Sequence, residues 1–249
     1  MILLAAVALA SRAAAQQPGS AGATRPNLKV LQALPEAQLF SMMNLVAESL
    51  GVRCDYCHVP EARDAAAAGP AGGPERLDFA SDDRVTKRTA RFMLRMVDSL
   101  NGVVLAALPQ RHDPPVRMDC VTCHRGSPLP QTLDVVLAQT VERQGVDSAV
   151  ARYRQLRQDV VAGRYDFGEL TVNDVARRLT AAGKPAEAIA LLQMNQEFYP
   201  NSAAIDLLFA DAHLARGERD AAIARVRTAL VKQPNNQQAQ RRLAQLTAP

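Results

Sequence analysis

The pentapeptide pattern C-x-x-C-H occurs twice in this chain and limits its fold and chemistry more than any other feature. The first copy is Cys54, Cys57 and His58, and the second copy is Cys120, Cys123 and His124. The chain of 249 residues holds four cysteines, so the two copies use all of them. An explanation must therefore account for two copies, and for the histidine that follows the second thiol in each.

Four kinds of site can be weighed for these cysteines. A zinc site of four thiolates would use every cysteine but leaves both histidines unexplained. A thioredoxin-type redox pair needs a βαβ context, which neither copy has. Disulfides across the motifs remain open for an exported chain. Covalent haem c accounts for every residue, because the two thiols add to the haem vinyl groups and the histidine binds the iron.

The spacing thus predicts two haem c groups. The residues predicted to attach them are Cys54, Cys57, Cys120 and Cys123, and the proximal iron ligands are His58 and His124. No cysteine is left over for another role. The iron of each haem then needs a sixth ligand, and methionine is a common choice that raises the reduction potential.

The first methionine-bearing segment is residues 36–50, whose apolar residues recur at helical spacing. Pro35 suits the first turn of this helix and Gly51 suits its C-terminal cap. Met42 and Met43 both lie in it, about 100° apart around the helix axis. The spacing alone leaves both open as the sixth ligand.

A second helix is expected over residues 82–101, with Ser81 as its N-cap and Gly102 at its end. Met93 and Met96 lie on its apolar face. A single methionine on such a face is usually core filler. The order of a methionine-bearing helix followed by C-x-x-C-H occurs twice, however, and this repetition favours one methionine ligand in each helix.

Residues 28–130 resemble the haem-binding part of the photosynthetic reaction centre cytochrome c subunit family. The matching segments are NLKVLQALPEAQLFSMMNLVAESLGVRCDYCH, TKRTARFMLRMVDSLN and CVTCHRGSPLP. The resemblance implies an all-α dihaem domain in which Met43 and Met93 are the sixth ligands. That family's subunit carries four haems, whereas this chain has two motifs. His112 lies near a position that ligates a later haem in four-haem proteins, but its proline-flanked setting favours a loop histidine.

The N-terminus is typical of an exported protein. Residues 1–15 contain a short apolar run followed by small residues that suit signal-peptide cleavage. The run is too short to span a bilayer. Residues 16–27 indicate a linker, because they include Pro18, Gly19, Gly22 and Pro26. We therefore expect a periplasmic protein, at most peripheral to the inner membrane.

Residues 131–249 are predicted to be helical, with an internal repeat over about 170–249. The repeat pairs Gly183, Ala188, Ile189, Pro200 and Asn201 with Gly217, Ala222, Ile223, Pro234 and Asn235. The offset of 34 residues is the tetratricopeptide period, so this region resembles a short tetratricopeptide array. Such arrays offer a groove for a protein or peptide. The alternative is that the repeat region does not bind a partner but packs over the haem domain and covers it.

Electron transfer between redox proteins is the function that this ligand set favours, because two six-coordinate irons leave no site for a substrate. A membrane-bound complex is one candidate partner. The net charge of +4 comes from interspersed acidic and basic residues and does not favour nucleic acid. A dihaem peroxidase or a haem-based sensor would need a displaceable ligand, and a peroxidase distal acid–base residues as well. The sequence names no catalytic residues of that kind.

Overall fold

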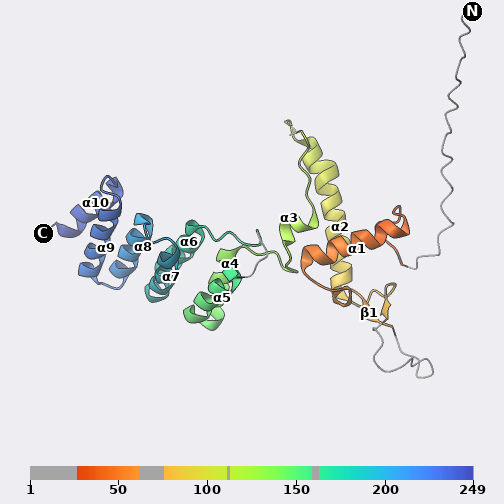
Figure 1. Cartoon of the computed structure of the whole chain (residues 1–249), viewed down its shortest axis with the longest axis horizontal. Helices are drawn as coiled ribbons and strands as arrows, with labels where there is room; N and C mark the ends of the chain where they lie inside the picture. Colours follow the sequence, from red (N-terminus) through yellow and green to blue (C-terminus); the bar gives the residue numbers. More distant parts are fainter. Residues whose placement is uncertain (1–26, 62–75, 111–112, 159–162, 249) are drawn as a thin grey trace, which may run out of the picture. The chain divides into compact units, whose positions relative to one another are not determined.

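The computed structural model describes residues 27–61, 76–110, 113–158 and 163–248 (Figure 1). The predicted signal peptide, the linker up to residue 26, and His112 lie outside these ranges. The described chain is helical, as predicted, apart from one antiparallel pair of two-residue strands, β1 (Val59–Pro60) and β2 (Leu77–Asp78). Within the same ranges, no helix has the length and apolar character needed to cross a membrane.

The chain forms two compact units. One consists of Met1–Ser41 and Arg53–Arg111, and the other of Met42–Val52 and His112–Pro249. Each unit is described by itself below.

Helix α1 spans Glu36–Leu50, as predicted from the sequence. Gly51 ends it with a left-handed φ of 66°. The amide of Gly51 donates to the carbonyl of Glu48 (3.1 Å), and the amide of Val52 donates to that of Ala47 (3.0 Å). These two bonds form a Schellman motif, in which glycine is favoured because it lacks a Cβ. The predicted role of Gly51 as a C-terminal cap is therefore confirmed.

Helix α2 spans Val85–Ser99, so the predicted start at residue 82 with Ser81 as the N-cap is wrong. The carboxylate of Asp78 accepts the amides of Ala80 (2.7 Å) and Ser81 (3.0 Å) and holds this segment in a turn. The Ser81 hydroxyl accepts the amide of Asp83 within the same turn. Because these backbone groups already have local partners, the helix begins later.

The predicted end at Gly102 is also wrong. The chain continues from α2 through a π-helical turn, η2 (Leu100–Val104), and a 3₁₀ turn, η3 (Leu105–Ala107). Gly102 lies inside η2 without a left-handed φ, so it does not act as a C-terminal cap. An inserted π turn shifts the angular position of the residues that follow it.

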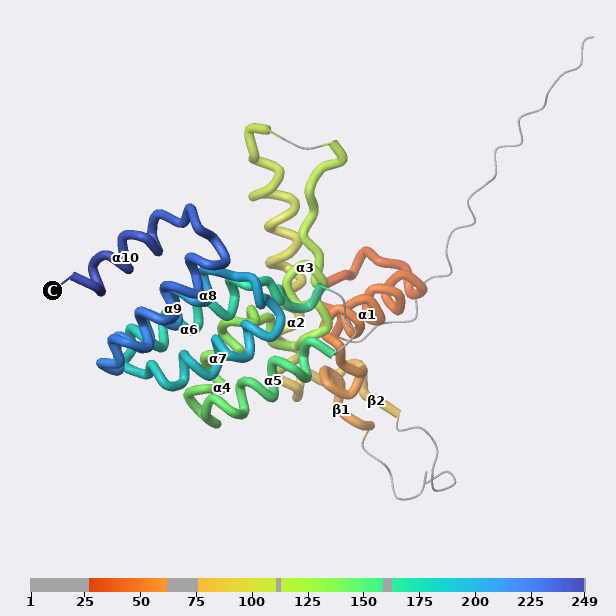
Figure 2. The backbone as a smooth tube through the Cα atoms, turned by 60° about the vertical axis from the view of Figure 1, so that its left-hand side comes forward, coloured from red at the N-terminus to blue at the C-terminus, as the bar shows by residue number. Residues whose placement is uncertain are grey.

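The C-terminal region is a succession of helices packed side by side (Figure 2). They are α4 (Leu133–Gln144), α5 (Val146–Gln158), α6 (Glu169–Ala181), α7 (Pro185–Phe198), α8 (Ala203–Ala215), α9 (Arg219–Lys232) and α10 (Gln237–Thr247). Gly183 and Gly217 have left-handed φ angles of 75° and 77° between the helices of successive pairs. Ala188 and Ala222 are both fully buried. The repeat predicted at an offset of 34 residues is thus confirmed as paired helices.

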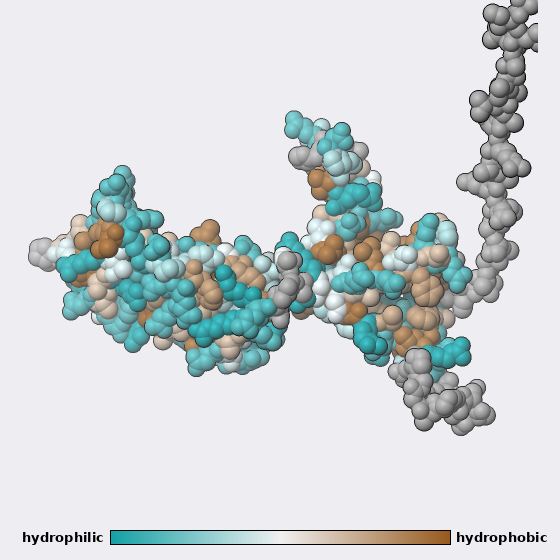
Figure 3. Space-filling view, in the orientation of Figure 1, coloured by the Kyte–Doolittle hydropathy of each residue, from teal (hydrophilic) through white to brown (hydrophobic). Residues whose placement is uncertain are grey.

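The buried apolar core is confined to this helical region. Its members among the described residues run from Leu133 to Ala239, in two clusters that follow the helix pairs. Between residues 27 and 130, the described residues that are buried are Ser49 and Lys87. Large apolar side chains in this part are instead exposed, and they form hydrophobic patches over α1 and α2 (Figure 3).

Replacing Gly51 by alanine tests a close backbone contact. A Cβ at Gly51 would lie 2.4 Å from the carbonyl oxygen of Gly126. Gly183 has a similar left-handed φ, but a Cβ there would meet nothing within 4 Å. We expect Gly183→Ala to cost about 1 kcal/mol of unfolding free energy, and Gly51→Ala about 3 kcal/mol, because the clash adds to the left-handed strain. Chemical denaturation of the full-length protein, followed by circular dichroism, measures both free energies, and equal costs would contradict this prediction.

Candidate haem-binding sites

The first C-x-x-C-H motif forms a tight helical turn, η1 (Cys54–Tyr56), just after α1. The amides of Cys57 and His58 both donate to the carbonyl of Cys54, at 3.2 Å and 3.0 Å. The Thr86 hydroxyl donates to the carbonyl of Tyr56 (2.5 Å) and anchors this turn to the start of α2. Burial raises the pKa of the Cys57 thiol above its ordinary value.

His58 lies against an aromatic ring and near two cations. Its imidazole contacts Phe79 edge-on, with ring centroids 4.8 Å apart. Its Nδ1 is buried and finds no hydrogen-bond partner among the described residues. Burial lowers the pKa of His58, and the charges of Lys87 and Arg91 lower it further. These effects favour the neutral imidazole, which is the form that ligates a metal.

The second motif forms a five-residue helix, α3 (Cys120–His124). Nδ1 of His124 lies 2.9 Å from the carbonyl oxygen of Ser127. A carbonyl only accepts, so this contact assigns the proton to Nδ1 and leaves the Nε2 lone pair for iron. The amide of Ser127 donates in return to the carbonyl of His124 (2.9 Å). This orienting role of Ser127 was not predicted from the sequence, although the glycine after Arg125 signals a turn there.

The turn that leaves the second motif is fixed from two sides. Arg125 and Gly126 both have left-handed φ angles, 48° and 77°. The amide of Gly126 donates to the carbonyl of Ser49 at the end of α1 (2.8 Å). The guanidinium of Arg164 donates to the carbonyls of Arg125 (3.1 Å) and Gly126 (3.0 Å). Arg164 lies 38 residues from Gly126, and no sequence signal pointed to it.

The predicted methionine ligands lie on the two expected helices. Met42 and Met43 are both half-buried on α1. On α2, Met93 is 36% exposed and Met96 is 39% exposed, with Phe92 beside them at 65%. Side chains of this kind suit the apolar faces of a porphyrin better than they suit water.

All four cysteines are free thiols. Within the described part of the chain, no three His, Cys, Asp or Glu side chains gather as a metal cluster. Each motif instead presents two thiols and an imidazole on one helical turn, near exposed apolar side chains. This donor set fits haem c.

The helical fold and the two C-x-x-C-H turns define a c-type cytochrome with tetratricopeptide-like helix pairs. The family model described as "Photosynthetic reaction centre cytochrome C subunit" matches residues 10–180, well over half of the chain. The chain belongs to this family. A tetratricopeptide repeat model matches residues 179–246.

The protein is also similar to a curated relative, cytochrome c-554 of Chloroflexus aurantiacus. The two are 33% identical over 103 residues, which make up 41% of this chain and 20% of that protein. The matched segment therefore spans about a fifth of the relative's length.

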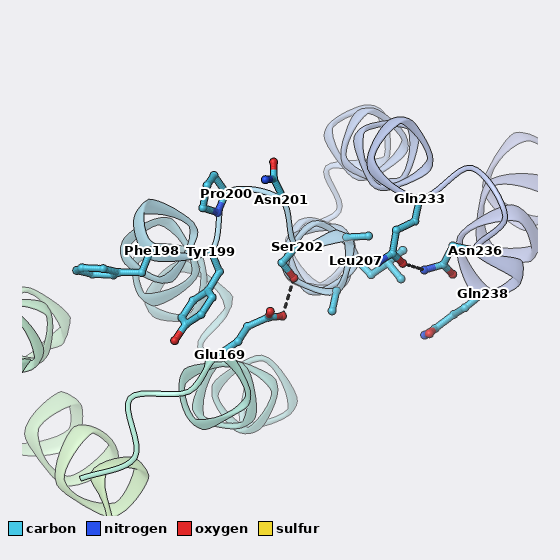
Figure 4. Close-up of a pocket in the computed structure, with 12 residues that line it drawn as sticks. Glu169, Phe198, Tyr199, Pro200, Asn201, Ser202, Leu207, Gln233, Asn236 and Gln238 are labelled. Atoms are coloured by element: carbon cyan, nitrogen blue, oxygen red, sulfur yellow. Dashed lines mark hydrogen bonds between the residues drawn. The ribbon is translucent and has the colours of Figure 1, made fainter. Parts of the chain in front are cut away.

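A pocket of about 590 Å³ lies among the helix pairs, at the N-terminal ends of α6, α8 and α10 (Figure 4). Within its lining, the Ser202 hydroxyl donates a hydrogen bond to the Glu169 carboxylate (2.6 Å). Gln233 and Asn236 form a second polar pair on its far side, joined by a 3.1 Å bond. The lining thus combines polar groups with apolar ones such as Leu207.

Arg164 is expected to hold the turn after the second motif closed. Arg164→Met removes two charge-assisted hydrogen bonds at a half-buried position, worth about 1.5–3 kcal/mol together. We expect the amide of Gly126 to exchange with solvent at least about tenfold faster, as measured by hydrogen-exchange mass spectrometry or NMR. Arg125→Met is the matched control, because that exposed side chain donates one 3.3 Å bond to the carbonyl of Gly163. Equal exchange rates in the two variants would count against the clamp.

Proposed function

We propose that this protein is a periplasmic dihaem c-type cytochrome that passes electrons between protein partners. The observation that carries the proposal is the twofold C-x-x-C-H turn in a chain of the reaction-centre cytochrome family. When bound, haem iron supplies a one-electron ferric–ferrous couple. The chain's own residues attach the cofactor, complete its coordination and keep water from it.

At the first site, Cys54 and Cys57 would form the thioether bonds and His58 would be the proximal ligand. Met43 would be the sixth ligand. The choice of Met43 over Met42 rests on the family resemblance. A thioether ligand favours ferrous iron and so raises the reduction potential.

At the second site, Cys120 and Cys123 would form the thioether bonds and His124 would be the proximal ligand. The hydrogen bond from His124 Nδ1 to Ser127 supports this role, because it leaves Nε2 for the iron. Met93 on α2 would complete the coordination. With His and Met on both irons, no coordination position is left for a substrate, which supports electron transfer over peroxide chemistry.

The partners would be redox proteins, one of them a membrane-bound complex. The tetratricopeptide-like region supports a docking role, since stacked helix pairs commonly present a surface to proteins or peptides. Its pocket is lined by the Glu169 carboxylate, by side-chain amides and by apolar groups, so it offers hydrogen-bond acceptors and donors to a bound polypeptide.

Covalent attachment can be counted directly. The intact mass of the exported wild-type protein is expected to include two haems. The double variant Cys54→Ser, Cys57→Ser should carry one haem fewer. Cys120→Ser with Cys123→Ser should lose the other, because each thiol pair serves one porphyrin. Wild-type protein with no covalent haem would refute the proposed function.

The methionine ligands can be tested by exchange for histidine. Met43→His and Met93→His should each lower the potential of one haem only, since bis-histidine ligation lacks the thioether that favours ferrous iron. Redox titration together with the near-infrared methionine-to-iron band measures the change. Met42→His and Met96→His are the matched controls on the same helices. If Met42→His shifts a potential and Met43→His does not, Met42 is the ligand instead.

A further inference from the structure

Lys87 is a buried cation in a part of the chain that buries almost nothing else. Its side chain is 10% exposed. Its ammonium donates to the carbonyls of Phe79 (2.8 Å), Ala80 (3.1 Å) and Ser81 (2.6 Å). These neutral acceptors satisfy its three N–H groups without cancelling its charge.

The nearest carboxylate does not neutralise this charge either. Asp82 lies 3.5 Å from the Lys87 ammonium and is also bound by Lys29 (2.8 Å) and Arg91 (2.7 Å). Asp78, the other carboxylate nearby, accepts two backbone amides. Three cations against two carboxylates leave the cluster with a net positive charge.

The cluster lies next to the first proximal histidine. Lys87 holds the carbonyl of Phe79, and the Phe79 ring packs on the His58 imidazole. The field of Lys87 acts through a partly dehydrated region, so solvent screens it less than it screens a surface charge.

We propose that Lys87 raises the reduction potential of the haem ligated by His58. This inference rests on the proposed function. Oxidation adds one positive charge at the iron, and a fixed ammonium nearby disfavours that charge. Lys87 also positions the imidazole, since it holds the segment 79–81 that carries Phe79. It is therefore a positioning and potential-setting residue, not an iron ligand.

The test is a spectroelectrochemical titration of the full-length holoprotein with Lys87→Gln. Glutamine keeps two N–H donors but removes the charge. One of the two redox waves should move to lower potential. At a fixed applied potential, the ferric-to-ferrous ratio of that haem should rise about tenfold, which corresponds to about 59 mV for one electron. Lys87→Arg keeps the charge and should leave both waves within about twofold of wild type.

Lys29→Gln is the matched control. It also removes one positive charge paired with Asp82, but the Lys29 side chain is 55% exposed to solvent. Solvent screening should hold its effect to less than about twofold. If Lys87→Gln shifts neither wave, or if Lys29→Gln shifts one equally, the inference is overturned. Lys87→Met removes the charge and all N–H donors of the side chain, so it should lower the potential at least as much as Lys87→Gln does. If the Lys87→Met protein has the same two potentials as the wild type, that result counts against the proposal.

A background of Cys120→Ser with Cys123→Ser keeps the first haem alone and assigns the wave. The shift from Lys87→Gln should persist in this background, and its disappearance would overturn the assignment to His58. If the background protein carries no haem at all while the wild type carries one, attachment at Cys54 and Cys57 is wrong. That outcome refutes the proposed function, and the titration outcomes above refute only the role of Lys87.

Discussion

The hydrogen bond between Gly126 and Ser49 is the contact on which much of this structure depends. It joins the turn that leaves the second C-x-x-C-H motif to the last turn of α1, at a distance of 2.8 Å. The approach is close enough that Gly51 has no room for a side chain. Arg164 then holds the same turn from the segment that leads into α6. As a result, the end of α1, the second motif and the helix pairs belong to one compact unit, so the helical region supports a candidate haem site and is more than an appended module.

The two parts of the chain are stabilised differently. The helix pairs bury their own apolar side chains, among them Tyr153 and Phe209, and therefore contain a complete core. The described residues from 27 to 130 bury only Ser49 and Lys87 and leave many large apolar side chains exposed. In the proposed function, the porphyrin faces would cover these side chains. Stability of this part would then be linked to cofactor attachment, because a group that binds only the folded chain stabilises it.

The sequence was sufficient for features that depend on local patterns. The extent of α1, the left-handed cap at Gly51 and the repeat of 34 residues each follow from periodicity or from glycine chemistry. The ends of α2 could not be predicted in this way. Its start depends on side chains such as Asp78, which capture backbone amides that a helix would otherwise use. Arg164 and Lys87 were missed for a related reason, since their partners are carbonyl groups, and a carbonyl is present at every residue.

The two motifs are identical in their defining residues, yet the structure gives their histidines different surroundings. His124 donates from Nδ1 to Ser127, which makes the imidazole more electron-rich and a stronger donor to an oxidised iron. His58 finds no such partner among the described residues and lies beside the net positive cluster around Lys87. If both histidines ligate haem iron as proposed, the two differences would act in the same direction, since each would favour ferrous iron at His58 relative to His124. An electron in the proposed dihaem pair would therefore rest preferentially at the first site. This polarity comes from residues outside the motifs, so two copies of one attachment sequence need not make two equivalent redox centres.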